Sequence, residues 1–169
     1  DAAQVSIHLE TYIFDFQGAP LAVAEAMERA ARRGTEVRLV VDGVGTGPPP
    51  PAWQERFDAA GVQCRVYAPL GRLGLLLPSR WRRLHRKLCV VDGTIGFCGG
   101  INLIDDYSDP RDGVLGFPRF DFAVCCTGPL VDAMDATMMQ LWWRLTAASK
   151  ARQREFRAAW LALRAAPRL

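Results

Sequence analysis

Apolar and polar residues in the N-terminal part of the chain follow two periods in turn. Three short runs rich in β-branched and apolar residues, 5–16, 36–43 and 62–67, predict β-strands. Between the first two, Leu21, Ala24, Met27 and Ala31 recur at helical spacing. A shorter helical segment, 52–61, precedes the third run. This alternation of strands and helices predicts an α/β sheet with right-handed crossovers.

The C-terminal part adds a hairpin and two helices. Residues 84–100 form two apolar runs joined at Asp92-Gly93, a strong hairpin signal. A polar loop, a strand at 121–128, a helix at 129–146 and a basic helix at 150–166 follow. We therefore expect a mixed, largely parallel β-sheet flanked by helices. Residues 1–147 are expected to form one domain, and 148–169 a separate basic helix.

Charge and composition limit the classes of molecule that the chain is expected to bind. The net charge is +3, yet residues 150–169 hold six basic residues against one acid and so carry +5, which leaves −2 elsewhere. A second basic cluster, Arg80, Arg82, Arg83 and Arg86, precedes the hairpin. Such clusters favour phosphate, lipid headgroups or nucleic acid. The five cysteines have no zinc-like spacing, so we expect buried, reduced thiols and no metal.

His85 and Lys87 carry the candidate chemistry. On a strand, residues two apart point to the same side, so the imidazole and the ammonium are expected side by side. Histidine can attack phosphorus, while lysine holds the non-bridging oxygens as negative charge builds. Asn102 offers an amide donor to the same oxygens, and Gly99 and Gly100 allow close approach of a ligand or a tight turn.

This arrangement resembles a known family motif. His-x-Lys, four residues, Asp92, six residues, Gly99-Gly100, x and Asn102 is similar to the HKD motif of the phospholipase D superfamily. The segments LETYIF, VRLVVDGVG, AAGVQCRVY and GGINLIDDY extend the resemblance to the cardiolipin synthases of that superfamily. Residues 1–147 would then be a phospholipase D-like catalytic half-domain with one motif.

The resemblance implies a role for each motif residue. His85 forms a phosphohistidine or protonates the leaving alkoxide, and Lys87 and Asn102 bind phosphate. Asp121 falls where the family has an acid that orients the imidazole, although Phe120 replaces the arginine usual before that acid. Asp92 belongs to the motif and is counted with the catalytic residues, yet a turn aspartate also suits hydrogen bonding to the backbone. This chemistry requires neither cofactor nor metal.

The family pairs two such motifs, and this chain has one. Either it is the first half of a longer enzyme or two copies pair as a homodimer. The implied function is phosphatidyl transfer between phospholipids at the cytoplasmic side of a bacterial inner membrane, with anionic phospholipid as substrate. The alternatives are a phosphodiesterase or nuclease of the same superfamily, or a non-catalytic half-domain. Few aromatic residues lie near the motif for base stacking, so nucleic acid is the less favoured partner.

Other features keep two interpretations each. Glu10 and Asp42, near strand ends, either touch substrate or satisfy backbone donors, and His8 is expected to be structural. The apolar tip at 73–77 either enters a membrane or packs on a second half-domain. The C-terminal helix either lies on anionic lipid or packs Phe156, Trp160 and Leu163 inward between domains.

Overall fold

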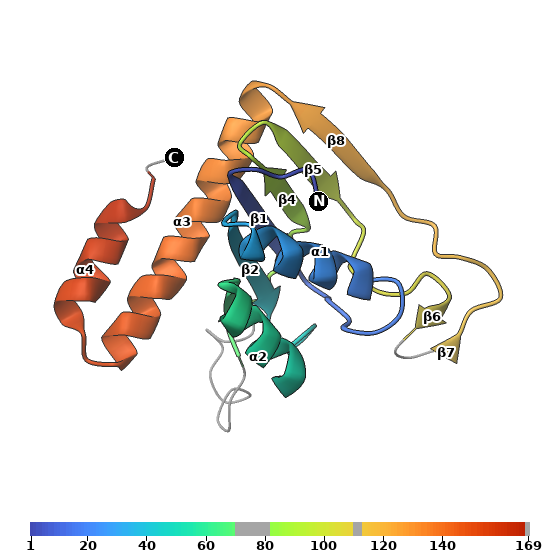
Figure 1. Cartoon of the computed structure of the whole chain (residues 1–169), viewed down its shortest axis with the longest axis horizontal. Coiled ribbons are helices and arrows are strands. Elements are labelled where there is room, and N and C mark those ends of the chain that lie inside the picture. The colour runs from blue at the N-terminus through green and yellow to red at the C-terminus, as the bar shows by residue number, and fades with distance from the viewer. Residues whose placement is uncertain (70–81, 110–112, 168–169) are drawn as a thin grey trace.

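The computed structural model describes residues 1–69, 82–109 and 113–167, so the apolar tip at 73–77 lies outside the described residues. A six-stranded sheet in the order β3-β2-β1-β4-β5-β8 forms its centre (Figure 1). The strands are β1 (Ser6–Thr11), β2 (Glu36–Asp42), β3 (Gln63–Tyr67), β4 (Leu88–Val91), β5 (Ile95–Gly99) and β8 (Ala123–Thr127). A separate small ribbon pairs β6 (Ser108–Asp109) with β7 (Gly113–Val114).

Strand directions confirm the predicted mixed sheet. β1 pairs with β2, and β2 with β3, in parallel. β4 runs antiparallel to β1, β5 to β4, and β8 to β5. β1, β2, β3 and β5 therefore share one direction, whereas β4 and β8 run the other way. The hairpin prediction is also confirmed, since Asp92 and Gly93 link β4 to β5 with φ of +52° and +62°.

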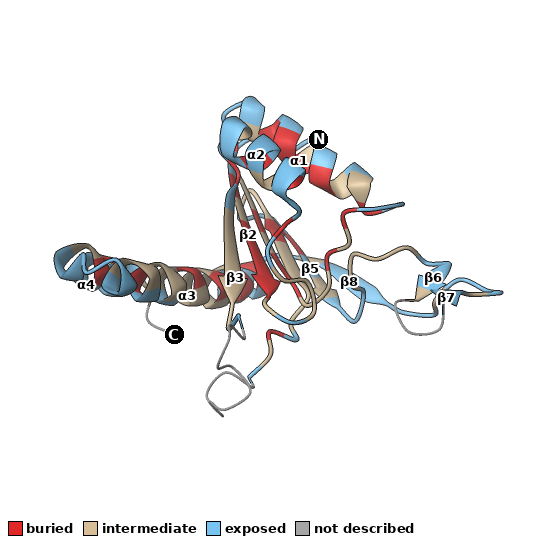
Figure 2. Cartoon of the chain, turned by 90° about the horizontal axis from the view of Figure 1, so that it is seen from below, coloured by how far each residue is buried: buried red, intermediate tan, exposed pale blue. Residues whose placement is uncertain are grey.

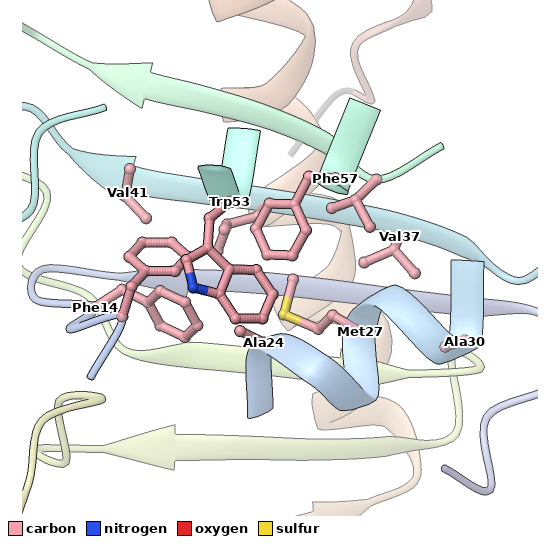
Figure 3. Packing of buried hydrophobic residues seen from close by; sticks show 11 residues of the cluster. Phe14, Ala24, Met27, Ala30, Val37, Val41, Trp53 and Phe57 are labelled. Carbon is pink, nitrogen blue, oxygen red and sulfur yellow. The ribbon is translucent and has the colours of Figure 1, made fainter. Parts of the chain in front are cut away.

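Helices α1 (Leu21–Arg32) and α2 (Pro51–Ala60) cover one face of the parallel strands. Met27 of α1 and Trp53 and Phe57 of α2 are buried in one apolar cluster with Val37 and Val41 of β2 (Figure 3). α1 is buried along one face and exposed along the other, as its apolar period predicts (Figure 2). This packing leaves β4, β5 and β8 outside the area that the two helices cover.

The opposite face packs against the 24-residue helix α3 (Pro129–Arg152). Val90 of β4 is buried against Val131, Met134 and Met138 of this helix. α3 continues across residue 148, where the sequence analysis begins its second segment, and the chain reverses only at 153–155. α4 (Phe156–Ala165) then packs back on α3.

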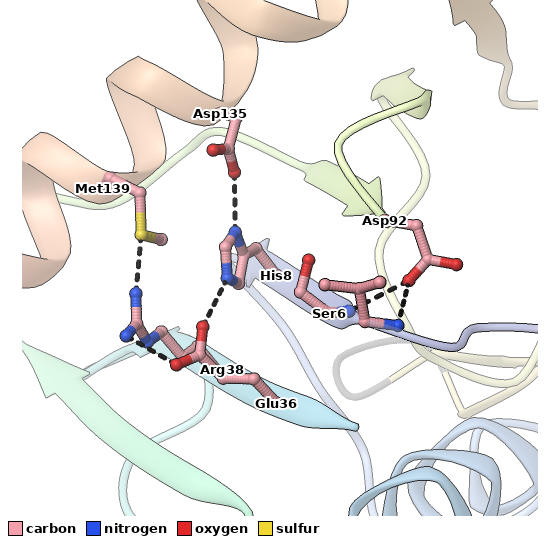
Figure 4. Close-up of polar contacts among 8 residues, drawn as sticks. Ser6, His8, Glu36, Arg38, Asp92, Asp135 and Met139 are labelled. Carbon is pink, nitrogen blue, oxygen red and sulfur yellow. Dashed lines mark hydrogen bonds and ion pairs between the residues drawn. The ribbon is translucent and has the colours of Figure 1, made fainter. Parts of the chain in front are cut away.

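His8 joins β1 to α3 through a buried polar contact, away from the motif. Its ring is only 6% exposed, and Nδ1 donates to Asp135 Oδ1 at 2.6 Å while Nε2 lies 3.3 Å from Glu36 Oε1 (Figure 4). Glu36 also pairs with Arg38 at 2.8 Å. In the β1–β4 pairing His8 lies opposite Val90, which is five residues further along the chain than His85. The buried position of His8 and its distance from the motif histidine agree with a structural role.

Candidate active site

Two buried carboxylates hold the segment that carries the motif. Asp42, at the end of β2, accepts the backbone N–H of Leu84 at 2.7 Å, and Glu10 on β1 pairs with Arg86 Nη2 at 2.8 Å. Asp42 and Glu10 are 0% and 1% exposed. Side chains near the carboxyl ends of the parallel strands β1 and β2 therefore hold residues 84–86 in place. The carboxyl ends of parallel strands are where α/β folds place ligands.

The tether fixes which side chains face outward. Leu84 is buried beside Val40 and Trp142, on the α3 side of the sheet, and Arg86 turns toward Glu10. His85, between them, is exposed. The expectation that His85 lies on a strand is wrong, because β4 begins only at Leu88. Alternation along this segment nevertheless gives His85 and Lys87 a common side.

His85 and Lys87 are in direct contact. Lys87 Nζ lies 3.3 Å from His85 Nε2 and donates to the His85 carbonyl oxygen at 3.2 Å. The Tyr12 ring packs beside both, with its centroid 5.2 Å from that of the imidazole and 5.7 Å from Lys87 Nζ. Partial burial lowers the pKa of Lys87, and the negative charge of Asp121 opposes that shift. An anion at this position would meet a preorganised cation.

Gly100 brings Asp121 to the site. A Cβ atom at Gly100 would collide with the Asp121 carboxylate, and one at Gly99 would collide with the Phe122 carbonyl oxygen. The backbone N–H of Gly100 donates to that oxygen at 2.9 Å. The two glycines thus make room for residues 121–122, whereas the sequence predicted close approach of a ligand or a tight turn at these positions. Asp121 Oδ1 accepts the backbone N–H of Phe122 at 2.7 Å, and its hydrogen bonds do not include one to His85.

Asn102 completes the group on the side of β1. Its Oδ1 accepts the backbone N–H of Ile13 at 3.1 Å, which fixes the amide in one orientation. Its Nδ2 makes no hydrogen bond to the described residues. The structure therefore brings His85 and Lys87 into contact and places Asp121 within electrostatic reach of Lys87. Asp121 and Asn102 line a common pocket, in which the amide donor of Asn102 is unused by the described residues.

Asp92 does not join this group. It lies beyond the far end of β4, and its carboxylate accepts the backbone N–H groups of Gln4, Val5 and Ser6 at 3.0, 2.7 and 2.9 Å. Figure 4 shows Asp92 beside Ser6. These hydrogen bonds lower the pKa of Asp92. The aspartate of the motif thus fastens the start of β1 to the hairpin turn, seven residues from His85, and we do not place it among the catalytic groups.

An apolar cavity of about 170 Å³ adjoins Lys87. Its side chains come from β1, β4, β5 and the segment after β5; they include Leu9, Cys89, Phe97, Ile101, Leu103 and Ala123. The polar residues of its lining are Glu10, Thr11 and Lys87. A charged amine that borders a largely apolar cavity suits an amphiphile with an anionic group. The part of the chain that the structure describes contains no cluster of three or more metal-ligating side chains.

Sequence reasoning missed Tyr12 and the Glu10–Arg86 pair. Tyr12 comes directly after β1, and the carboxyl end of a parallel strand is a general signal for site residues. Arg86 was read only as part of a basic cluster. Its partner lies 76 positions earlier in the chain, so local sequence could not reveal the pair.

Known proteins resemble the chain over most of its length. Residues 1–111 match the family described as "Cardiolipin synthase, PLD-like domain". The cardiolipin synthase of Geobacillus thermodenitrificans is 34% identical over 146 residues, 86% of this chain and 28% of that protein. Cardiolipin synthase B of Shigella flexneri is 33% identical over 152 residues, 84% of this chain and 36% of that protein. The chain thus spans about a third or less of these relatives.

Solved structures share the fold. Nuc from Salmonella typhimurium, a phospholipase D family member, aligns with a TM-score of 0.55 at 19% identity, over 84% of this chain and 80% of that one. NucT from Helicobacter pylori aligns with a TM-score of 0.58 at 14% identity, over 82% and 79%. At these identities the likeness establishes the phospholipase D fold.

Proposed function

The chain belongs to the cardiolipin synthase family of phospholipase D-like domains, and we propose that it is one half of an active site that transfers phosphatidyl groups between phospholipids. The observation that carries this proposal is the 3.3 Å contact between Lys87 Nζ and His85 Nε2 on an exposed, tethered segment. Residues 1–147 would supply this half-site, and residues 148–169, which include the end of α3 and the whole of α4, would form a basic C-terminal segment packed on it.

The chemistry proceeds in two displacements. His85 Nε2 attacks the phosphorus of a phosphatidyl donor, a P–N bond forms, and the bond from phosphorus to the leaving alcohol oxygen breaks. Lys87 and Asn102 Nδ2 hold the non-bridging oxygens. An acid from a second half-site gives the leaving oxygen its proton. The hydroxyl of an acceptor lipid then attacks phosphorus and gives its proton to the group of the second half-site, which now acts as a base. The P–N bond breaks, and His85 is released.

Asp121 acts as the positioning acid of this half-site. Its charge acts on Lys87, and Gly100 leaves room for it. General acid–base sites require a third group to orient the base, and Asp121 would take that role from its place near Lys87, although in this structure it makes no hydrogen bond to His85.

Exposed apolar side chains on both faces of the β5–β8 end of the sheet support pairing with a second half-domain. Ile95 and Phe97, on one face of β5, are 39% and 41% exposed, and Phe122 and Val124, on the opposite face in and before β8, are 65% and 61% exposed. β8 also ends the sheet among the described strands. An apolar sheet edge of this kind is normally covered. The cover would be the remainder of a longer chain or a second copy.

The apolar cavity beside Lys87 favours a lipid substrate over nucleic acid. Binding to single strands depends on aromatic faces on which bases stack. The cavity is instead lined mainly by aliphatic and thiol side chains, with Phe97 as its aromatic residue. No described helix has the length and apolarity to cross a bilayer. We place the substrate at the cytoplasmic surface of a bacterial inner membrane, which this domain would contact either peripherally or with the help of an anchoring segment outside these residues.

Intact-mass spectrometry with phosphatidylglycerol vesicles tests the proposal. The longest available form of the protein should gain the mass of a phosphatidyl group on His85 when the reaction is quenched within seconds in denaturant without acid, which would hydrolyse the P–N bond, and cardiolipin should appear as product. His85→Asn should abolish both, whereas His8→Asn should retain both if it folds. Cleavage of single-stranded DNA without any lipid product would instead favour the nuclease alternative.

Sedimentation of this chain alone separates the two forms of the half-site. A dimer that yields lipid product would identify a second copy as the partner. If this chain is a monomer without turnover and becomes active when the remainder of a longer chain is added, the half-site belongs to a longer enzyme. Full turnover by a monomer would contradict the half-site proposal itself.

A further inference from the structure

Helix α4 attaches to the domain through its smallest side chains. Ala159 and Ala162 are buried against Ala147 of α3, with Trp143 packed beside them. The helical hairpin of α3 and α4 extends away from the sheet (Figures 1 and 2). Alanines let two helices approach closely, so this contact forms without the large apolar residues of α4.

Those large residues lie elsewhere on the helix. Phe156, Trp160 and Leu163, spaced four and three apart, share one face and are 69%, 54% and 54% exposed. The alanine face makes the contact with α3, so the three large residues are not buried within this chain. Their packing between domains stays a prediction, because it requires a second domain. An exposed stripe of a phenylalanine, a tryptophan and a leucine on one helix therefore needs another apolar environment.

Positive charge accompanies this stripe. Arg157 and Arg164 are exposed, seven residues apart on the neighbouring face of α4, and the Arg164 guanidinium lies 4.7 Å from the Trp160 ring centroid. The segment 150–169 carries +5, with Glu155 as its one acid, and Lys150 pairs with Glu155 at 2.9 Å. A stripe of large apolar residues bordered by arginines matches the boundary between acyl chains and anionic headgroups.

We propose that α4 is a docking helix that lies in the surface of an anionic phospholipid bilayer, with Phe156, Trp160 and Leu163 inserted and Arg157 and Arg164 at the phosphates. A second copy or another protein segment would bring its own apolar face. The two arginines of α4, for which the described residues show no carboxylate partner, match the anionic headgroup layer of a bilayer. The proposal is independent of the catalytic one, because α4 holds no motif residue.

Vesicle flotation tests the proposal directly. The chain should float with vesicles of phosphatidylcholine mixed with phosphatidylglycerol and remain unbound with phosphatidylcholine alone, and added salt should weaken binding. The triple variant Phe156→Ser, Trp160→Ser, Leu163→Ser should bind these vesicles at least about tenfold more weakly than the parent chain. Arg157→Glu with Arg164→Glu should lose the preference for anionic vesicles. All five side chains are exposed, so these variants should keep the circular dichroism of the parent.

Matched variants make the result decisive. Val114→Ser with Phe117→Ser removes exposed apolar residues elsewhere, 89% and 82% exposed, and should leave binding unchanged. His85→Asn should also bind normally, which separates docking from catalysis. Equal binding by the stripe variant, equal binding to neutral vesicles, or a dimer in solution that the stripe variant dissociates would each overturn the proposal.

Discussion

The buried carboxylate of Asp42 accepts the backbone N–H of Leu84 at 2.7 Å, across 42 residues of chain. Asp42 also accepts the N–H groups of Val44 and Gly45 at 2.8 and 3.0 Å, and it pairs with Arg83 at 3.3 Å. One side chain at the end of β2 thus fixes both its own turn and the segment that presents His85.

Replacing Asp42 should weaken this anchor. Asp42→Ala leaves buried N–H groups without an acceptor and should lower the free energy of unfolding by about 2–4 kcal/mol. Asp42→Asn keeps one acceptor oxygen and should cost less. Urea unfolding of both variants measures the order. If Asp42→Ala matched the parent in stability, the anchor would be energetically unimportant.

Glu10 should make stability depend on pH. Burial raises the pKa of Glu10 from 4.5 to about 7, and the Arg86 charge only partly opposes this shift. The folded state therefore holds the proton more tightly than the unfolded state. The resulting stabilisation, on the order of 3 kcal/mol, is complete below pH 4.5 and is lost as pH rises through about 7.

Glu10→Gln should remove this dependence. Unfolding free energies measured at about pH 5 and about pH 8 should differ less for Glu10→Gln than for the parent chain. Glu55→Gln, an exposed carboxylate on α2, is the matched control and should retain the slope of the parent. A slope unchanged by Glu10→Gln would mean that another group titrates.

Gly100→Ala should disturb the site through Asp121. The new methyl group would meet the Asp121 carboxylate, so residues 121–122 must shift, at about 1–3 kcal/mol in stability. Turnover of the longest active form should fall with it. Gly116→Ala adds the same methyl group to open space and should change neither quantity. Equal effects of the two substitutions on turnover would rule out a specific role for the glycine.

Asp92 should behave as a structural residue. Asp92→Asn removes the charge that faces three backbone N–H groups and should cost about 1–2 kcal/mol at neutral pH. Because those groups lower the pKa of Asp92, its stabilisation is present above the ordinary pKa of 3.8 and is lost as pH falls through the folded value. The cost should therefore shrink in acid. Lost phosphohistidine formation in a fully stable Asp92→Asn would instead restore Asp92 to the catalytic group.

Local sequence patterns predicted the helices, strands and the hairpin turn well, because these elements depend on the spacing of residues that are close together in the chain. The apolar period of α1, the alternation of its neighbouring strands and the Asp92-Gly93 turn each depend on residues a few positions apart. The same patterns placed His85 and Lys87 on one side, even though the strand itself begins later. They could not show whether Cys125, expected to be buried, would be exposed on the edge strand β8.

The sequence by itself determined the α/β fold class, the family and the pairing of His85 with Lys87, because motif spacing and periodicity survive in one dimension. Tertiary structure alone decided that Asp92 fastens β1, that Glu10 and Asp42 hold the motif segment, and that α4 exposes its large residues. These features depend on which groups meet although tens of residues separate them in the chain, or on which face of a helix packs most closely. The spacing of neighbouring residues does not encode either of these.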